Sequence, residues 1–233
     1  MGFTPELEVA IARARAELTR SHHDLVRRGL ISSDEAHVSV RVPGADLLVI
    51  TSPELHYDDI APESLVICDL DGVVVADALG SELAPAREAA AHAHVYRSLD
   101  EVGAIVHTHS PYAVAWAAAG EPLPAVLTTS ARRFGGEVPV GPLVVSDEED
   151  LGRGLVETLL GSRSPAVLMA GHGPFTVGPD ARSAVDTALQ LEEAAQSTYL
   201  ARQLGSPAPL GQSAIDALRS ERLDGRTTRE VLA

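Results

Sequence analysis

The stretch Ala104-Ile-Val-His-Thr-His-Ser-Pro111 determines how the rest of the chain is interpreted. Its apolar start predicts a buried strand, and alternate residues of a strand point to one face of a sheet, so His107 and His109 are expected side by side. Ser110 and Pro111 are typical of a helix start, as N-cap and first helical residue. The strand is therefore expected to end in two imidazoles that form half of a metal site.

A third imidazole is predicted from Gly171-His172-Gly173, which follows a second apolar run at residues 166–170. The flanking glycines would let the backbone turn sharply and bring His172 close to the first pair. Histidine is accepted by zinc, manganese, iron and cobalt, so the sequence leaves the ion open. The alternative is that these imidazoles are ordinary residues at strand ends.

The composition and net charge argue against several classes of protein. The chain has 233 residues, of which 18 are basic and 33 acidic, giving a formal net charge of −15. This charge argues against binding to nucleic acid or to an anionic membrane as the main function. Cys68 is the single cysteine, which excludes an internal disulfide and favours a reducing compartment. The sequence has no signal-peptide pattern and no apolar run of membrane-spanning length, so we expect a soluble cytoplasmic protein.

The remaining patterns predict one mixed α/β domain over residues 1–204. Helical spacing of apolar residues predicts helices at 4–29 and 85–99, and apolar runs on both sides of Asp71-Gly72 predict a hairpin. Residues 122–142 are rich in Gly and Pro and are expected to form a loop with short strands. Helices are also expected from Ser146 to Leu160 and from Asp180 to Leu204. The tail, residues 205–233, is expected to be mobile or to pack on a neighbouring subunit.

Three motifs in this order carry a family resemblance: Asp69-Leu-Asp-Gly72, Glu101-Val-Gly-Ala-Ile-Val-His-Thr-His-Ser110 and Gly171-His-Gly-Pro-Phe175. Together they resemble the class II aldolase/adducin family, whose members include fuculose-phosphate aldolase and ribulose-phosphate 4-epimerase. The resemblance extends from Leu7 to Leu204. It implies an α/β fold with three α/β/α layers around a mixed, largely antiparallel sheet. It also implies a homotetramer with sites between subunits.

The resemblance also assigns roles to residues. It implies one divalent metal ion per subunit, zinc, manganese, iron or cobalt, held by His107, His109 and His172. The family's acid/base carboxylate precedes the histidine pair on a helix, which corresponds to Glu88 here. Without the resemblance, Glu88 would be interpreted as an acid that suits the positive end of a helix.

The chain departs from the family in the loops that hold a substrate phosphate. The small and hydroxyl residues expected there are replaced by Glu35-Ala36-His37, Ser52-Pro53-Glu54 and Ala86-Arg87. Phosphate is best held by hydroxyls, backbone N–H groups and cations, and the two glutamates would repel it. The loss of all three loops argues that the substrate carries no phosphate.

Four residues are predicted to contact a substrate instead. Arg87, Arg132 and Arg133 offer guanidinium groups that match carboxylates bidentately, and His37 replaces a polar residue of the first phosphate loop. For the arginines the alternative is a solvated charge. His92 and His94 are interpreted as plain helix residues.

These inferences predict a metal-dependent lyase that decarboxylates a hydroxylated aromatic dicarboxylate, such as 3,4-dihydroxyphthalate or a hydroxypyridine dicarboxylate, in aromatic catabolism. Its partner would be a small anionic molecule, with no nucleic acid and no membrane. The first alternative is an aldolase or epimerase acting on a sugar phosphate. The others are an oxygen-dependent iron enzyme and a non-enzymatic binding module.

Overall fold

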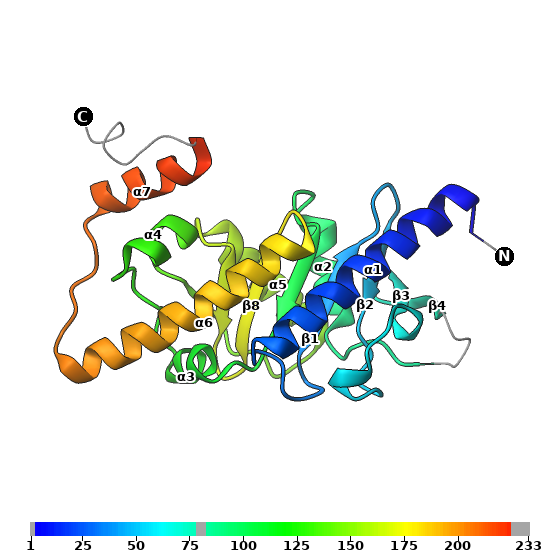
Figure 1. The fold of residues 1–233 in the computed structure, drawn as a ribbon, viewed down its shortest axis with the longest axis horizontal. Coiled ribbons are helices and arrows are strands. Elements are labelled where there is room, and N and C mark those ends of the chain that lie inside the picture. Colours follow the sequence, from blue (N-terminus) through cyan, green and yellow to red (C-terminus); the bar gives the residue numbers. More distant parts are fainter. Residues whose placement is uncertain (1–2, 78–82, 225–233) are drawn as a thin grey trace.

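The structure is a computed structural model that describes residues 3–77 and 83–224. Its centre is an eight-stranded sheet with the order β4-β3-β2-β1-β5-β8-β7-β6 (Figure 1). The strands are β1 (His37–Arg41), β2 (Leu47–Ile50), β3 (Val66–Asp69), β4 (Val74–Asp77), β5 (Ala104–His107), β6 (Val140–Gly141), β7 (Ala166–Met169) and β8 (Gly173–Gly178). Every neighbouring pair is antiparallel except β6 and β7. The sheet is mixed and largely antiparallel, as the family resemblance implied.

Helices cover both faces of the sheet. They are α1 (Pro5–Arg27), α2 (Ala89–Ser98), α3 (Pro111–Ala119), α4 (Thr128–Phe134), α5 (Glu148–Leu160), α6 (Ala181–Leu204) and α7 (Gln212–Asp224), and short 3-10 turns lie at Tyr57–Asp59 and Pro62–Ser64. Helices α1, α3 and α6 pack on one face, whereas α2 and α5 pack against each other on the opposite face. The three-layer α/β/α prediction is therefore confirmed.

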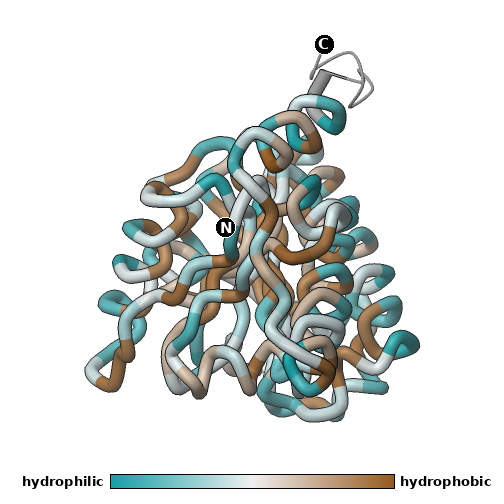
Figure 2. Tube along the Cα trace, turned by 90° about the vertical axis from the view of Figure 1, so that its left-hand side faces the viewer, coloured by the Kyte–Doolittle hydropathy of each residue, from teal (hydrophilic) through white to brown (hydrophobic). Residues whose placement is uncertain are grey.

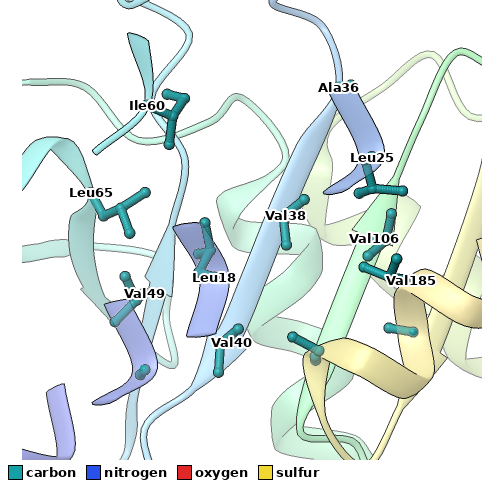
Figure 3. Close-up of a cluster of buried hydrophobic side chains, with 14 of the residues drawn as sticks. Leu18, Leu25, Ala36, Val38, Val40, Val49, Ile60, Leu65, Val106 and Val185 are labelled. Carbon is teal, nitrogen blue, oxygen red and sulfur yellow. The ribbon is translucent and has the colours of Figure 1, made fainter. Parts of the chain in front are cut away.

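The core under α1 and α6 shows how the first layer is held. Val38 and Val40 of β1 and Val106 of β5 point toward the same side, where they meet Leu18 of α1 and Val185 of α6 (Figure 3). All of these side chains are buried. Burying one such aliphatic side chain stabilises the fold by about 1.5–3 kcal/mol.

The alternate residues of β5 face the other layer. Ile105 packs with Phe175 of β8 and Tyr96 of α2 in a second buried cluster. Because the side chains of a strand alternate, His107 points to the same face as Ile105, toward α2. This parity places the first predicted metal ligand beneath the start of α2.

The hydropathy of the helices fits their position on the two faces of the sheet, with one side of each helix buried. Figure 2 shows hydrophobic and hydrophilic residues alternating along the helical turns, as expected for helices with one buried face. None of the helices in the described residues is both long and apolar enough to cross a membrane.

Several predicted elements are confirmed, including the hairpin formed by β3 and β4 around Asp71-Gly72. Helix α3 begins after Ser110 with Pro111 in its first turn and ends at Gly120, whose φ of +65° suits glycine. Helix α2 begins at Ala89 and not at residue 85. The preceding backbone is used elsewhere, since Ala86 N–H donates to Thr51 O over 3.0 Å.

The loop prediction for residues 122–142 was wrong in its middle. Helix α4 occupies Thr128–Phe134, so Arg132 and Arg133 lie in its last turn. Gly135 ends the helix with a φ of +70°. The glycines that suggested a loop are therefore the C-terminal stop of a short helix.

Part of the predicted tail folds onto its own chain. Helix α7 lies beside α4 (Figure 1), where Ile215 and Leu218 are buried against Ala125 and Ala131. This packing differs from the expectation that residues 205–233 are mobile or pack on a neighbour. Residues 225–233 of that tail lie outside the described part.

Candidate metal and acid–base site

Three histidines converge at one edge of the sheet. His107 ends β5, His109 follows between β5 and α3, and His172 lies in the turn between β7 and β8. The Nε2 atoms of His107 and His109 are 3.1 Å apart. One ring nitrogen of each of the three lies within 4.8 Å of the others, which suits a single metal ion.

Glycines make this approach possible. Gly171 adopts a φ of +67°, which lets the chain turn tightly just before His172. A Cβ at Gly173 would lie 3.2 Å from Thr108 O and 3.4 Å from Cε1 of His107. A side chain at position 173 would fit only tightly against Thr108 O, so this position favours glycine.

His107 is oriented by its surroundings. Its Nδ1 lies 2.9 Å from Pro174 O, so it donates there and leaves the Nε2 lone pair directed at the cluster. The ring also stacks on Phe175, with centroids 4.0 Å apart and planes 15° apart. Burial lowers the pKa of His107 well below its ordinary value, and the carboxylate of Glu88 only partly offsets this effect.

The pKa of His172 is lowered too, because burial outweighs the opposing effect of Glu88. Neutral imidazoles are the form that binds a metal. The donor set of His107, His109 and His172 therefore fits a divalent ion and leaves coordination positions for a substrate.

Glu88 is the carboxylate next to this cluster. It is the buried N-cap residue of α2, with Oε2 2.8 Å from Nε2 of His37 and Oε1 3.7 Å from Nε2 of His172. Burial by itself would raise the pKa of Glu88, but His37, and after it His107 and His92, outweigh burial and lower the pKa to about 2. Glu88 is therefore an ionised carboxylate at neutral pH and can accept a proton.

His37 is the first residue of β1, and its side chain reaches Glu88. It pairs with His107 across β1 and β5, and its side chain is buried. Its closest polar contact is Glu88, so within one chain His37 holds the carboxylate in place.

His92 lies one helical turn beyond Glu88, in the core beneath α2. It is fully buried, and its Nδ1 lies 2.8 Å from Oγ of Ser39, which in turn lies 2.8 Å from the hydroxyl of Tyr96. Burial lowers the pKa of His92 to about 3. This imidazole is a neutral core residue, as the sequence analysis expected.

A cavity of about 300 Å3 opens beside Glu88 and His172. Arg87 lines it and is exposed, which places this predicted substrate-binding residue at the site. Glu148 of α5 also lines the cavity, and its pKa is raised by burial and by Glu88. Sequence reasoning missed Glu148, since residues 146–149 have the pattern of a helix cap and only the packing of α5 on α2 brings it there.

Arg132 and Arg133 are not brought to the histidines. They line a different cavity together with Gly178, at the end of β8 away from His172. A six-residue strand separates the two ends by roughly 17 Å. Helix α4, which carries both arginines, packs against α6 and α7. Their predicted role in substrate binding stays a prediction.

Comparison with known proteins gives a consistent result. Residues 16–199 match the family model described as "Class II Aldolase and Adducin N-terminal domain". This match covers most of the chain and includes Glu88 and all three histidines.

Solved structures agree with the family model. The chain is similar to an L-fuculose 1-phosphate aldolase with a TM-score of 0.82 and 25% identity, over 90% of this chain and 95% of that one. The L-fuculose-1-phosphate aldolase from Thermus thermophilus is 28% identical, with a TM-score of 0.68 over 84% and 99% of the two chains.

A third similar structure is YgbL from Klebsiella pneumoniae, for which aldolase, epimerase and decarboxylase activities are open alternatives. It is 25% identical, with a TM-score of 0.74 over 90% of this chain and 99% of that one. The similar structures thus include proteins connected with more than one reaction.

Proposed function

Because the chain belongs to the class II aldolase and adducin family, we propose that it is a divalent-metal-dependent carbon–carbon lyase that decarboxylates a hydroxylated aromatic dicarboxylate. The observation that supports this proposal is a buried, ionised Glu88 beside the convergent imidazoles of His107, His109 and His172. His107, His109 and His172 would hold the metal. Such an ion supplies positive charge that stabilises an oxygen next to the carbon losing its substituent.

The hydrogen bonds made by two of the loops that replace the family's phosphate loops support a substrate without phosphate. The backbone N–H of Ala86 donates to Thr51 O, and that of Ala84 lies 3.4 Å from Oε2 of Glu54. These donors are therefore engaged by the chain itself. A phosphate approaching them would also meet the negative charge of Glu54.

The chain's own groups account for the proton transfers. Ionised Glu88 takes the proton of a substrate hydroxyl and delivers it to the ring carbon that bears the leaving carboxylate. The carbon–carboxylate bond then breaks, carbon dioxide leaves, and the bonding electron pair returns to the ring and its oxygen. Arg87, at the mouth of the same cavity, orients a substrate carboxylate. His37 keeps Glu88 in position.

The test is carbon dioxide release by the metal-reconstituted protein. 3,4-Dihydroxyphthalate and hydroxypyridine dicarboxylates are offered, and release is expected only when metal is present. Release that persists in the Glu88→Gln variant would contradict the assigned proton carrier.

A second candidate is cleavage or epimerisation of a sugar phosphate. The observation that favours it is the similarity to two L-fuculose 1-phosphate aldolases at 25% and 28% identity. Turnover of L-fuculose 1-phosphate, with none of the aromatic di-acids, would replace the decarboxylase proposal. The same metal and Glu88 would then act on an aldol bond.

A further inference from the structure

A second cavity is lined by arginines from separate parts of the chain. Its volume is about 350 Å3, and its lining includes Arg132 and Arg133 of α4, Arg163 after α5, and Arg219 and Arg222 of α7. The 18 basic residues of this acidic chain are all arginines, and five of them meet here. Bringing like charges together opposes folding unless something compensates them.

Two of the five are compensated by carboxylates of the chain. Arg132 pairs with Glu221 at 2.9 Å, and Arg163 pairs with Asp216 at 2.6 Å. Both pairs are partly exposed, and such ion pairs contribute little to stability.

The other three arginines donate to neutral groups. Arg133 Nε donates to Gln190 Oε1 at 2.9 Å, and Arg222 Nη1 donates to Arg133 O at 3.0 Å. Arg219 Nη1 donates to Arg163 O at 2.9 Å. No carboxylate in the described ranges forms an ion pair with Arg133, Arg219 or Arg222.

Their positive charges act on one another. The pKa of Arg133 is lowered by burial and then by Arg222, and that of Arg219 is lowered by burial and then by Arg163 and Arg222. Asp186 only partly offsets the effect on Arg133, and a guanidinium remains charged in spite of such shifts, so the cavity has an excess of positive charge.

We propose that this cavity is a binding site for a small dianion, either a phosphate-type tetrahedral anion or a dicarboxylate. Arg133, Arg219 and Arg222 would contact it, since guanidinium forks bind both groups bidentately. Ser183 of α6 lines the same cavity and adds a hydroxyl group. The bound anion would connect α4, α6 and α7, and so hold the C-terminal helix against the domain.

The site is separate, within one chain, from the histidine cluster. The two lie at opposite ends of β8. The inference goes beyond the proposed function and does not depend on which reaction the histidine site performs.

The test uses sulfate on the full-length protein, because sulfate stays dianionic across the working pH range. At a hundredfold excess over Kd, sulfate is expected to raise Tm by roughly 5–10 °C against chloride at matched ionic strength. It is also expected to slow amide hydrogen exchange in residues 212–222. Phosphate and malonate, tested in the same way, distinguish tetrahedral from dicarboxylate ligands.

Single substitutions test which residues bind the sulfate. Arg222→Gln and Arg133→Gln are each expected to weaken sulfate binding at least about tenfold. Arg153→Gln removes an exposed arginine paired with Asp150 on α5 and should leave binding unchanged. His109→Ala should also leave it unchanged, because the histidines lie at the other end of β8.

Two outcomes would overturn the proposal. One is a sulfate effect that disappears in His109→Ala and persists in Arg222→Gln, which would assign the anion to the histidine site. The other is no effect of sulfate, phosphate or malonate on either Tm or hydrogen exchange. If Arg222→Gln fails to fold, Arg222→Lys keeps the charge but loses the bidentate fork, and a several-fold weaker affinity is then expected.

Discussion

The groups at the two ends of β8 favour ligands of opposite charge. At the Gly173 end, three imidazoles converge beside the ionised Glu88, which suits a cation. At the Gly178 end, arginines outnumber their carboxylate partners, which suits an anion. The first site is built from strand ends and their turns, whereas the second is assembled from helices and loops distant in sequence. The contrast shows how one sheet can separate two binding chemistries.

The largest expected effect is at the Gly173 end. His109→Ala should remove bound metal and lower turnover by at least about a thousandfold, because the stabilisation supplied by the ion is worth several kcal/mol. Metal content by mass spectrometry and turnover are measured together. His23→Ala, on α1 and outside the cluster, is the control. Full metal occupancy in His109→Ala would remove this residue from the ligand set.

Glu88→Gln should separate metal binding from proton transfer. The variant is expected to retain metal and to lose roughly 100- to 10,000-fold in kcat, since the amide cannot accept the proton. Glu149→Gln, which changes an exposed acid in the first turn of α5, is the matched control. Equal losses of metal and activity in Glu88→Gln would indicate a structural role for this carboxylate.

The buried His92 should also make the stability of the fold sensitive to acid. Burial lowers the pKa of His92 to about 3, so the unfolded chain binds a proton below about pH 6.5 that the folded chain rejects. Stability is therefore complete above that pH and falls as the pH falls. Between pH 7 and pH 5, protonation of His92 in the unfolded chain should decrease the free energy of unfolding by about 2 kcal/mol.

Urea unfolding of metal-free protein at the two pH values measures this slope. His92→Gln should flatten it, whereas Arg222→Gln, at the other end of β8, should leave it unchanged. A slope that is the same with and without His92 would assign the acid sensitivity to other groups.

The smallest expected effect concerns Glu148. Its carboxylate lies in the cavity beside Glu88, so Glu148→Gln should reduce repulsion toward a dianionic substrate. We expect KM to fall roughly two- to fivefold with kcat nearly unchanged, as for a partly screened charge. Steady-state kinetics with Glu148→Gln and Glu149→Gln side by side would test this. A large fall in kcat would instead make Glu148 part of the proton transfer.

Local patterns in the sequence accounted for much of the sheet and its helix caps. Three short-range features were predicted, and the structure has each of them. They are the apolar strand Ala104–His107, the helix start at Ser110-Pro111 and the turn at Asp71-Gly72. The three histidines could be singled out because each follows an apolar strand, and because the glycines around His172 indicate a tight turn.

Only the tertiary structure decided where the charged side chains act. Arg132 and Arg133 could be recognised as a pair, but their position at the far end of β8 depends on how α4 packs against α6 and α7. Glu148 reached the Glu88 cavity because α5 packs on α2. Strand alternation and turn chemistry depend on neighbouring residues and can be read from a sequence. The meeting of distant charges depends on how whole layers pack, and that is set by the buried core.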